Sequence, residues 1–159
     1  MRRSAMAIFV LLIALMMQRV GAATQEREFA AIMTGDQEVP PVQTATTGDV
    51  RIEFNDDFTA ATFTLTVNDG VRVQQAHIHC APLGVNGPIV VFLAGFHAPG
   101  WDVNGKWIDH VQFTNANIVN TTCGTTLAEL AQSMEDGKTY ANVHTVAHPG
   151  GEIRGQIVR

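Results

Sequence analysis

The chain of 159 residues is poor in several residue types, and each shortage argues against a class of function. Only 10 residues are Lys or Arg, against 15 Asp or Glu, so the formal net charge is −5. A negative surface repels nucleic acid and anionic lipid, and we therefore expect neither as a partner. No nucleophile triad and no glycine-rich phosphate loop is evident, so the sequence gives no support to a hydrolase or a kinase.

Long apolar runs are also scarce, and the one at the N-terminus is short. Basic residues precede the apolar segment Ala5–Met17, and small residues follow it at Gly21–Ala23, as in a secretory signal peptide. The run is too short to span a membrane comfortably, although an uncleaved anchor is the alternative. We expect residues 1–23 to be a signal peptide and residues 24–159 to be a secreted or periplasmic domain without membrane attachment. Cleavage leaves 7 basic residues against 15 acidic ones, a net charge of −8.

Cysteine is limited to Cys80 and Cys123. In an oxidising compartment we expect a disulfide between them. Closing a loop of roughly 40 residues would stabilise the fold by up to about 4 kcal/mol. The alternative is that Cys80, which follows His79, is a thiolate ligand as in blue-copper sites. Such sites usually have a Met or another weak axial donor close by, and none lies near His77, His79 or His144.

Short segments with alternating apolar and polar residues, separated by turn residues, predict a β-rich fold. The expected strands are residues 28–34, 49–54, 59–67, 71–79, 89–93, 107–113, 139–145 and 152–158. Asn68-Asp69-Gly70 predicts a hairpin between two of them. Phe96–Lys106 is glycine-rich and aromatic, and we expect it to be a loop. Seven or eight strands are typical of a sandwich or barrel, so the predicted fold is an all-β Greek-key β-sandwich, superoxide dismutase-like or immunoglobulin-like.

One short helix interrupts the strands. Thr126 and Glu129 have the spacing of a capping box, and Gly137 is placed to end the helix. Apolar residues recur on one face of the segment between them. We expect this helix to cover one end of the sandwich.

The histidines indicate a polar site on this β scaffold. His77 and His79 are two residues apart, so their side chains lie on the same side of a strand. Neutral imidazole is a common metal ligand and suits copper, zinc, iron and nickel. Their neighbours Ala76 and Ile78 are apolar and belong in the core, which places both histidines on the outer side of the sheet. Apolar residues at positions 71 and 73 break this alternation and predict a bulge near Gln74-Gln75.

The same alternation places residues of two later strands on the outer side. His144 is on the first and Arg154 on the second, so three strands direct histidine and arginine side chains to one side, outside the core and under loops. His148 follows in a His-Pro-Gly-Gly turn and is a further candidate ligand. His97 and His110 have no evident partners, and we interpret them as ordinary polar residues.

Two outer residues and one segment have simpler interpretations. Glu152 and Arg154 could form a cross-strand ion pair of little energetic weight. The role of the segment Gln37-Glu38-Val39-Pro40-Pro41 stays open, because its acid and prolines are equally compatible with a shaped loop.

Three long segments resemble the CHRD domain, which is named from chordin. They are Phe29–Val42, Ala76–Val91 and Tyr140–Gln156, and the resemblance spans about residues 28–158. Chordin is an extracellular antagonist of bone morphogenetic proteins, and the domain also occurs as a single exported bacterial domain. The resemblance implies an extracellular binding or matrix role.

The chain is more distantly similar to copper and copper–zinc superoxide dismutases, which have a Greek-key sandwich and a His-x-His strand. By this resemblance His77 and His79 match that pair, and His144 matches a later histidine ligand. Arg154 matches an arginine that guides the anion to copper. The zinc-binding loop of several histidines and an aspartate is not visible between residues 80 and 89, so the resemblance implies a copper-only or simple metal-holding site.

Two hypotheses of function follow. In the first, the domain binds a transition metal, copper favoured over zinc, and carries out redox chemistry on a small oxygen species. Its expected metal ligands are His77, His79, His144 and His148, with Arg154 as the catalytic residue. In the second, the domain is a non-catalytic extracellular binding or matrix module. The aromatic loop Phe96–Lys106, with Trp101 and Trp107, would then be the contact surface.

Overall fold

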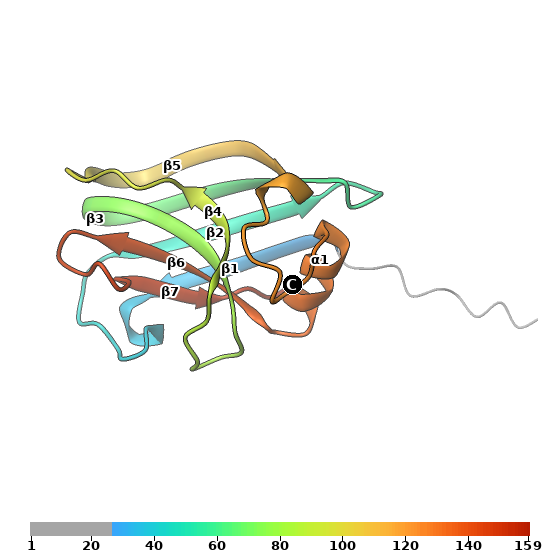
Figure 1. Ribbon diagram of the computed structural model, residues 1–159. Helices are drawn as coiled ribbons and strands as arrows, with labels where there is room; N and C mark the ends of the chain where they lie inside the picture. The colour runs from blue at the N-terminus through green and yellow to red at the C-terminus, as the bar shows by residue number, and fades with distance from the viewer. Residues whose placement is uncertain (1–26) are drawn as a thin grey trace, which may run out of the picture.

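The computed structural model describes residues 27–159, and the expected signal peptide, residues 1–23, lies outside this range. Seven strands and one α-helix make up this part of the chain. The strands are β1 Glu28–Thr34, β2 Thr47–Phe54, β3 Ala60–Cys80, β4 Ile89–Ala94, β5 Trp101–Thr114, β6 Thr139–Thr145 and β7 Ile153–Gln156. The helix α1 is Leu127–Glu135, and two 3-10 turns are η1 Gly35–Gln37 and η2 Asn115–Asn117. The predicted all-β class with one helix is confirmed (Figure 1).

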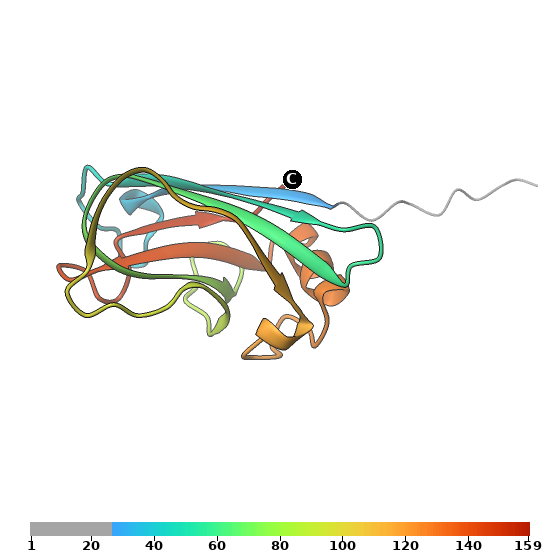
Figure 2. The ribbon, with the colours of Figure 1, turned by 90° about the horizontal axis from the view of Figure 1, so that it is seen from above.

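The long strand β3 holds the two halves of the fold together. Its first half pairs with β2 and β5, and its second half pairs with β6 and β4. The strand order β2-β1-β7-β6-β3-β4, with the additional β2–β3 pairing, closes the sheet into a barrel-like sandwich. Figure 2 shows β3 bending round at one end of the molecule, so that it belongs to both layers.

The hairpin predicted at Asn68-Asp69-Gly70 is wrong. The chain does not reverse there, because residues on both sides of it belong to one strand, β3. Asp69 and Arg72 have positive φ angles of 54° and 51°, and the pairing with β5 shifts register around Gly70. The residues that suit a reversal instead bend the strand between the two layers. A further register shift between Val73 and Gln75 confirms the predicted bulge.

The loop predicted at Phe96–Lys106 is partly wrong, because Trp101–Lys106 belong to β5. β5 pairs only with β3 among the described strands and is therefore an edge strand. Most of its side chains are exposed or half-buried on both faces, so its sequence lacks the clear alternation of a strand with one face in the core.

Alternate residues of the strands fill the interior. Phe29, Phe54, Phe63 and Phe113 form a buried aromatic group with edge-to-face contacts at centroid distances of 5.9–6.3 Å. Helix α1 starts with the predicted capping box and adds its apolar face to the same core. It lies at one end of the sandwich (Figure 2), as expected from the sequence.

The expected disulfide joins Cys80 to Cys123 with an S–S distance of 1.97 Å. It ties the end of β3 to the segment that precedes α1 and so holds the strand directly after His79. With both sulfur atoms in this bond, the structure gives Cys80 no role as a thiolate ligand. In the described residues, no helix has the length and apolar character needed to cross a bilayer.

Candidate metal centre

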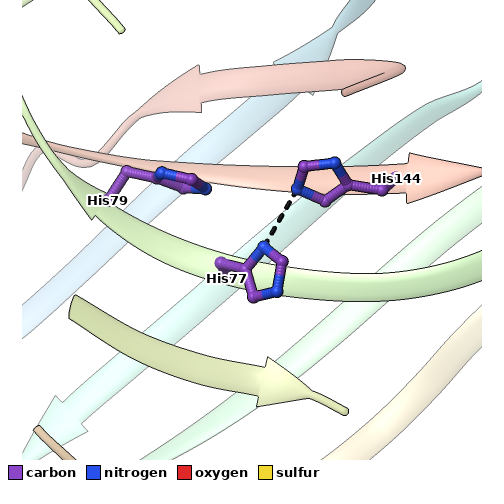
Figure 3. A group of neighbouring side chains, drawn as sticks. All are labelled: His77, His79 and His144. Atoms are coloured by element: carbon purple, nitrogen blue, oxygen red, sulfur yellow. Dashed lines mark hydrogen bonds between the residues drawn. The ribbon is translucent and has the colours of Figure 1, made fainter. Parts of the chain in front are cut away.

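Three histidines from two adjacent strands meet on one face of the sheet. His77 and His79 come from β3, and His144 comes from β6, which is hydrogen-bonded to β3. Each offers a ring nitrogen, and these three nitrogens lie within 4.8 Å of one another. Nδ1 of His77 is 2.9 Å from Nε2 of His144, and Figure 3 shows this contact with His79 beside it.

The three rings point away from the apolar core but are shielded from solvent. Ala76 and Ile78 on β3 are in the core, so the predicted alternation of this strand is confirmed. His77, His79 and His144 are nevertheless only 0, 8 and 6 % exposed. All seven residues of β6 are buried, because loops cover the face of the sheet that the alternation predicted to be the outer one.

Backbone carbonyls of two covering loops orient two of the rings. Nδ1 of His79 is 2.9 Å from the carbonyl oxygen of Gly87, and Nδ1 of His144 is 2.9 Å from that of Pro149. A carbonyl only accepts, so both Nδ1 atoms carry the hydrogen and both Nε2 atoms present a lone pair. Metal-binding histidines almost always donate their other N–H to such an acceptor. Two of the three rings therefore have the tautomer that a metal site requires.

The buried nitrogen atoms are incompletely satisfied. Nε2 of His77 and Nε2 of His79 have no hydrogen-bond partner in the described structure. Since Nε2 of His144 presents a lone pair, Nδ1 of His77 donates to it, and the two unpartnered lone pairs of the cluster are on Nε2 of His77 and Nε2 of His79. Buried polar atoms without partners are uncommon and are a reason to look for a bound group.

Burial also keeps these rings neutral. It lowers the pKa of His77 to about 3, with further lowering by the nearby His144 and His79. Burial lowers the pKa of His79 to about 4, although the hydrogen bond to Gly87 opposes the shift. Burial lowers the pKa of His144 as well. Neutral imidazole is the form that binds metal, so protons compete weakly for this site at neutral pH.

An aromatic ring and a guanidinium group stack beside His79. The ring of Tyr140 is 4.7 Å from that of His79 and inclined by only 7°, and the Arg154 guanidinium carbon is 3.5 Å from the centroid of Tyr140. The hydroxyl of Tyr140 accepts a hydrogen bond from the backbone N–H of Gly87 at 3.2 Å. Tyr140 therefore supports both His79 and the residue that orients it.

Arg154 is only 1 % exposed. Its guanidinium donates to Oδ1 of Asn86 at 3.0 Å and to the carbonyl of Val85 at 2.9 Å, with a longer contact to Pro82. These contacts fasten the loop that carries Gly87. The role of Arg154 in attracting an anion stays a prediction, and the structure gives this residue a positioning task that sequence reasoning missed.

The acid of the segment 37–41, whose role the sequence left open, is part of the same buried network. Glu38 is 6 % exposed, and its Oε1 accepts a hydrogen bond of 2.6 Å from Asn142. Asn142 lies between His77 of β3 and Arg154 of β7 in the sheet. Burial raises the pKa of Glu38 to about 7, against the opposing charge of Arg154. The sequence signal that could have indicated this role of Glu38 was the predicted outward position of Asn142. Once loops cover that face, the Asn142 amide needs a hydrogen-bond partner, and a loop residue supplies it.

The remaining polar candidates lie apart from the cluster. His148 is half-buried in the turn after β6 and is not one of the three grouped histidines. His97 stacks on Trp101, and His110 contacts Asp109. The ion pair considered between Glu152 and Arg154 is not among the ion pairs of residues 27–159. Its carboxylate accepts from the hydroxyls of Thr44, Thr46 and Thr145.

The fold and the site together define a β-rich domain that encloses a histidine cluster between its sheet and its loops. The family model of the CHRD domain matches residues 29–157, which is nearly all of the described chain. The chain therefore belongs to the CHRD domain family. Comparison with curated proteins and with solved structures finds no significant match.

Proposed function

We propose that this CHRD domain is an extracellular module that binds one transition-metal ion through His77, His79 and His144. The observation that carries the proposal is the combination of three converging neutral imidazoles with the carbonyl-oriented Nδ1 atoms of two of them. Nε2 of His79 supplies an unpartnered lone pair, and Nε2 of His144 supplies the lone pair that accepts from Nδ1 of His77. Nδ1 of His77 faces the other two rings (Figure 3), so it would bind the metal with the proton of this ring moved to Nε2. His148, outside the cluster, is at most an accessory ligand.

Copper is the favoured metal, and zinc is the alternative. A site of imidazole nitrogens suits both metals. In the general order of affinity of divalent first-row metal ions for a given site, Cu(II) binds most tightly. The absence of a carboxylate from the three-residue cluster argues against calcium or magnesium, which prefer oxygen ligands.

A bound copper ion would supply one-electron redox chemistry, and superoxide is the substrate that the more distant resemblance suggests. The chain's own contribution would be a positive charge, because Arg154 lies beside the Tyr140–His79 stack. If this proposal is right, copper-loaded protein consumes superoxide in pulse radiolysis, and Arg154→Ala is slower. A rate no higher than that of free copper would reject catalysis and leave metal binding standing.

A non-catalytic contact role is the second candidate, and an exposed aromatic patch favours it. Phe96 and Trp101 are 65 and 40 % exposed, and Trp101 lies 5.5 Å from Trp107. Aromatic residues are enriched in the centres of protein interfaces. This patch lies on and before β5, whereas the histidines lie on β3 and β6, so the two roles can be tested separately.

The deciding experiment is metal titration of the purified domain by calorimetry after dialysis. Wild type should bind about one Cu(II) or Zn(II), and His77→Ala/His79→Ala should bind none, because both lost rings are ligands. His97→Ala/His110→Ala is the matched control, since it removes two histidines outside the cluster. If the double variant does not fold, the single variant His79→Gln replaces it in the titration, because His79 is the less buried of the two residues. Equal uptake by wild type and by the ligand variants would overturn the proposal.

A further inference from the structure

Phe92 covers the most deeply buried histidine of the cluster. It lies on β4 directly opposite His77 of β3, and the two rings are 4.8 Å apart and almost perpendicular, at 86°. His77 is fully buried, whereas Phe92 is 48 % exposed. One side of the phenyl ring therefore shields His77, and the other side faces solvent.

The other groups that cover the cluster are fastened by hydrogen bonds. Gly87 and Pro149 accept from His79 and His144, and the loop of Gly87 is also held by the guanidinium of Arg154. Moving either loop breaks these bonds and leaves buried polar groups without partners, which costs about 1–3 kcal/mol for each group. Turning the side chain of Phe92 aside breaks no side-chain hydrogen bond, because a phenyl ring makes none.

The backbone pairing around Phe92 is irregular. The pairing of β3 with β4 shifts register on both sides of the His77–Phe92 pair. Within the described residues, β4 pairs as a strand only with β3, and its other edge has an isolated bridge between Val91 and Ile118. Val91 and Leu93 on either side of Phe92 are nevertheless buried in the core, and the N–H of Val119 donates to the carbonyl of Val90, so the side chain of Phe92 and not the strand is the part that can move.

We propose that Phe92 is the gate of the histidine cluster. Its phenyl ring limits the rate at which a metal ion or small ligand reaches His77 and the size of the ligand that can enter. The proposal rests on the proposed metal-binding function. A gate of this kind changes the rates of uptake and release together and leaves the affinity nearly unchanged, because Phe92 contributes no ligand atom. If the open state makes up about 0.1–10 % of the population, removing the ring accelerates uptake by at least about tenfold.

The kinetic test uses Phe92→Ala, Phe92→Trp and wild type, with Zn(II) supplied from a chromophoric indicator in a stopped-flow instrument. Phe92→Ala should take up zinc at least about tenfold faster than wild type, and the larger ring of Phe92→Trp should slow uptake. Val111→Ala is the matched control, since Val111 is 46 % exposed on the other edge strand, β5. Uptake rates of all variants within twofold of wild type would overturn the gate.

A second readout needs no metal. Carbethoxylation of His77 by diethyl pyrocarbonate, located by peptide mass spectrometry in metal-free protein, should be slow in wild type and in Val111→Ala and fast in Phe92→Ala. Failure of wild type to bind either Cu(II) or Zn(II) at equilibrium would reject the proposed function, while this reactivity would still decide whether Phe92 shields His77. Unchanged reactivity in Phe92→Ala would overturn the gate even if metal binding is established.

Discussion

Gly87 orients His79 through its carbonyl, and replacing Gly87 by alanine tests that orientation directly. A Cβ atom at this position would lie 2.0 Å from the carbonyl oxygen of Cys80 and 2.7 Å from its carbonyl carbon. Both are backbone atoms of a residue fixed by a disulfide, so the loop has to move. In Gly87→Ala the 2.9 Å contact with Nδ1 of His79 and the 3.2 Å hydrogen bond to Tyr140 should both be lost.

The expected loss of metal affinity follows from the role of the carbonyl. Removing an outer partner of a ligating histidine typically weakens metal binding by about 10- to 100-fold. This corresponds to about 1.4–2.8 kcal/mol of binding free energy. The metal-free fold should also lose about 1–3 kcal/mol, because two hydrogen bonds of ordinary strength disappear.

Competition titration against a chelator of known affinity measures the first effect, and urea unfolding of the metal-free protein measures the second. Gly95→Ala is the matched control. A Cβ there would meet no atom within 4 Å, and Gly95 is not among the glycines with a positive φ angle. Metal binding by Gly87→Ala as tight as that of wild type and Gly95→Ala would refute the argument that the carbonyl of Gly87 orients a ligand.

Three further outcomes are expected. Burial raises the pKa of Glu38 to about 7, so the stability that its protonated form contributes is lost as pH rises through 7. Thermal melts should therefore show that Glu38→Gln is more stable than wild type at pH 8 and of similar stability at pH 4.5. Burial lowers the pKa values of His77 and His79 to about 3 and 4, so the unfolded state binds more protons than the folded state below pH ~6.5. Urea unfolding should therefore show that the metal-free protein loses stability as the pH falls from about 6.5 to about 4. Replacing Cys80 and Cys123 by serine, across a separation of 43 residues, should lower the free energy of unfolding by about 4 kcal/mol, and an unchanged urea midpoint would contradict this.

Local sequence patterns were sufficient for most strands and for the helix. The alternation of residues 28–34 predicts β1 with its observed bounds, and the capping box at Thr126 gives the start of α1. The continuity of β3 could not be predicted in this way. Asn68-Asp69-Gly70 provides residues that tolerate positive φ, and both a reversal and a bend use them. Hydrogen bonding to strands elsewhere in the chain decides between the two, and local patterning does not contain that information.

The candidate site was predictable where it depends on strand periodicity and not where it depends on loops. Two-residue spacing places His77 and His79 on one face, and the alternation of β6 adds His144 to the same side. Glu38 and Gly87 come from covering loops whose positions have no sequence period. The same loops bury the cluster, so the degree of burial and the resulting pKa shifts also follow only from the folded structure.

The hydrogen-bond deficit of the cluster is the strongest physical reason to expect a ligand there. Leaving Nε2 of His77 and Nε2 of His79 buried without partners costs about 1–3 kcal/mol for each atom. That is a large part of the stability of a typical domain, about 5–15 kcal/mol, and an apolar side chain at either position would avoid it. The fold instead surrounds these rings with groups that orient them. A metal present at about 100 times its Kd would stabilise the folded state by about 2.7 kcal/mol, which is comparable to the cost of the two unpartnered nitrogens.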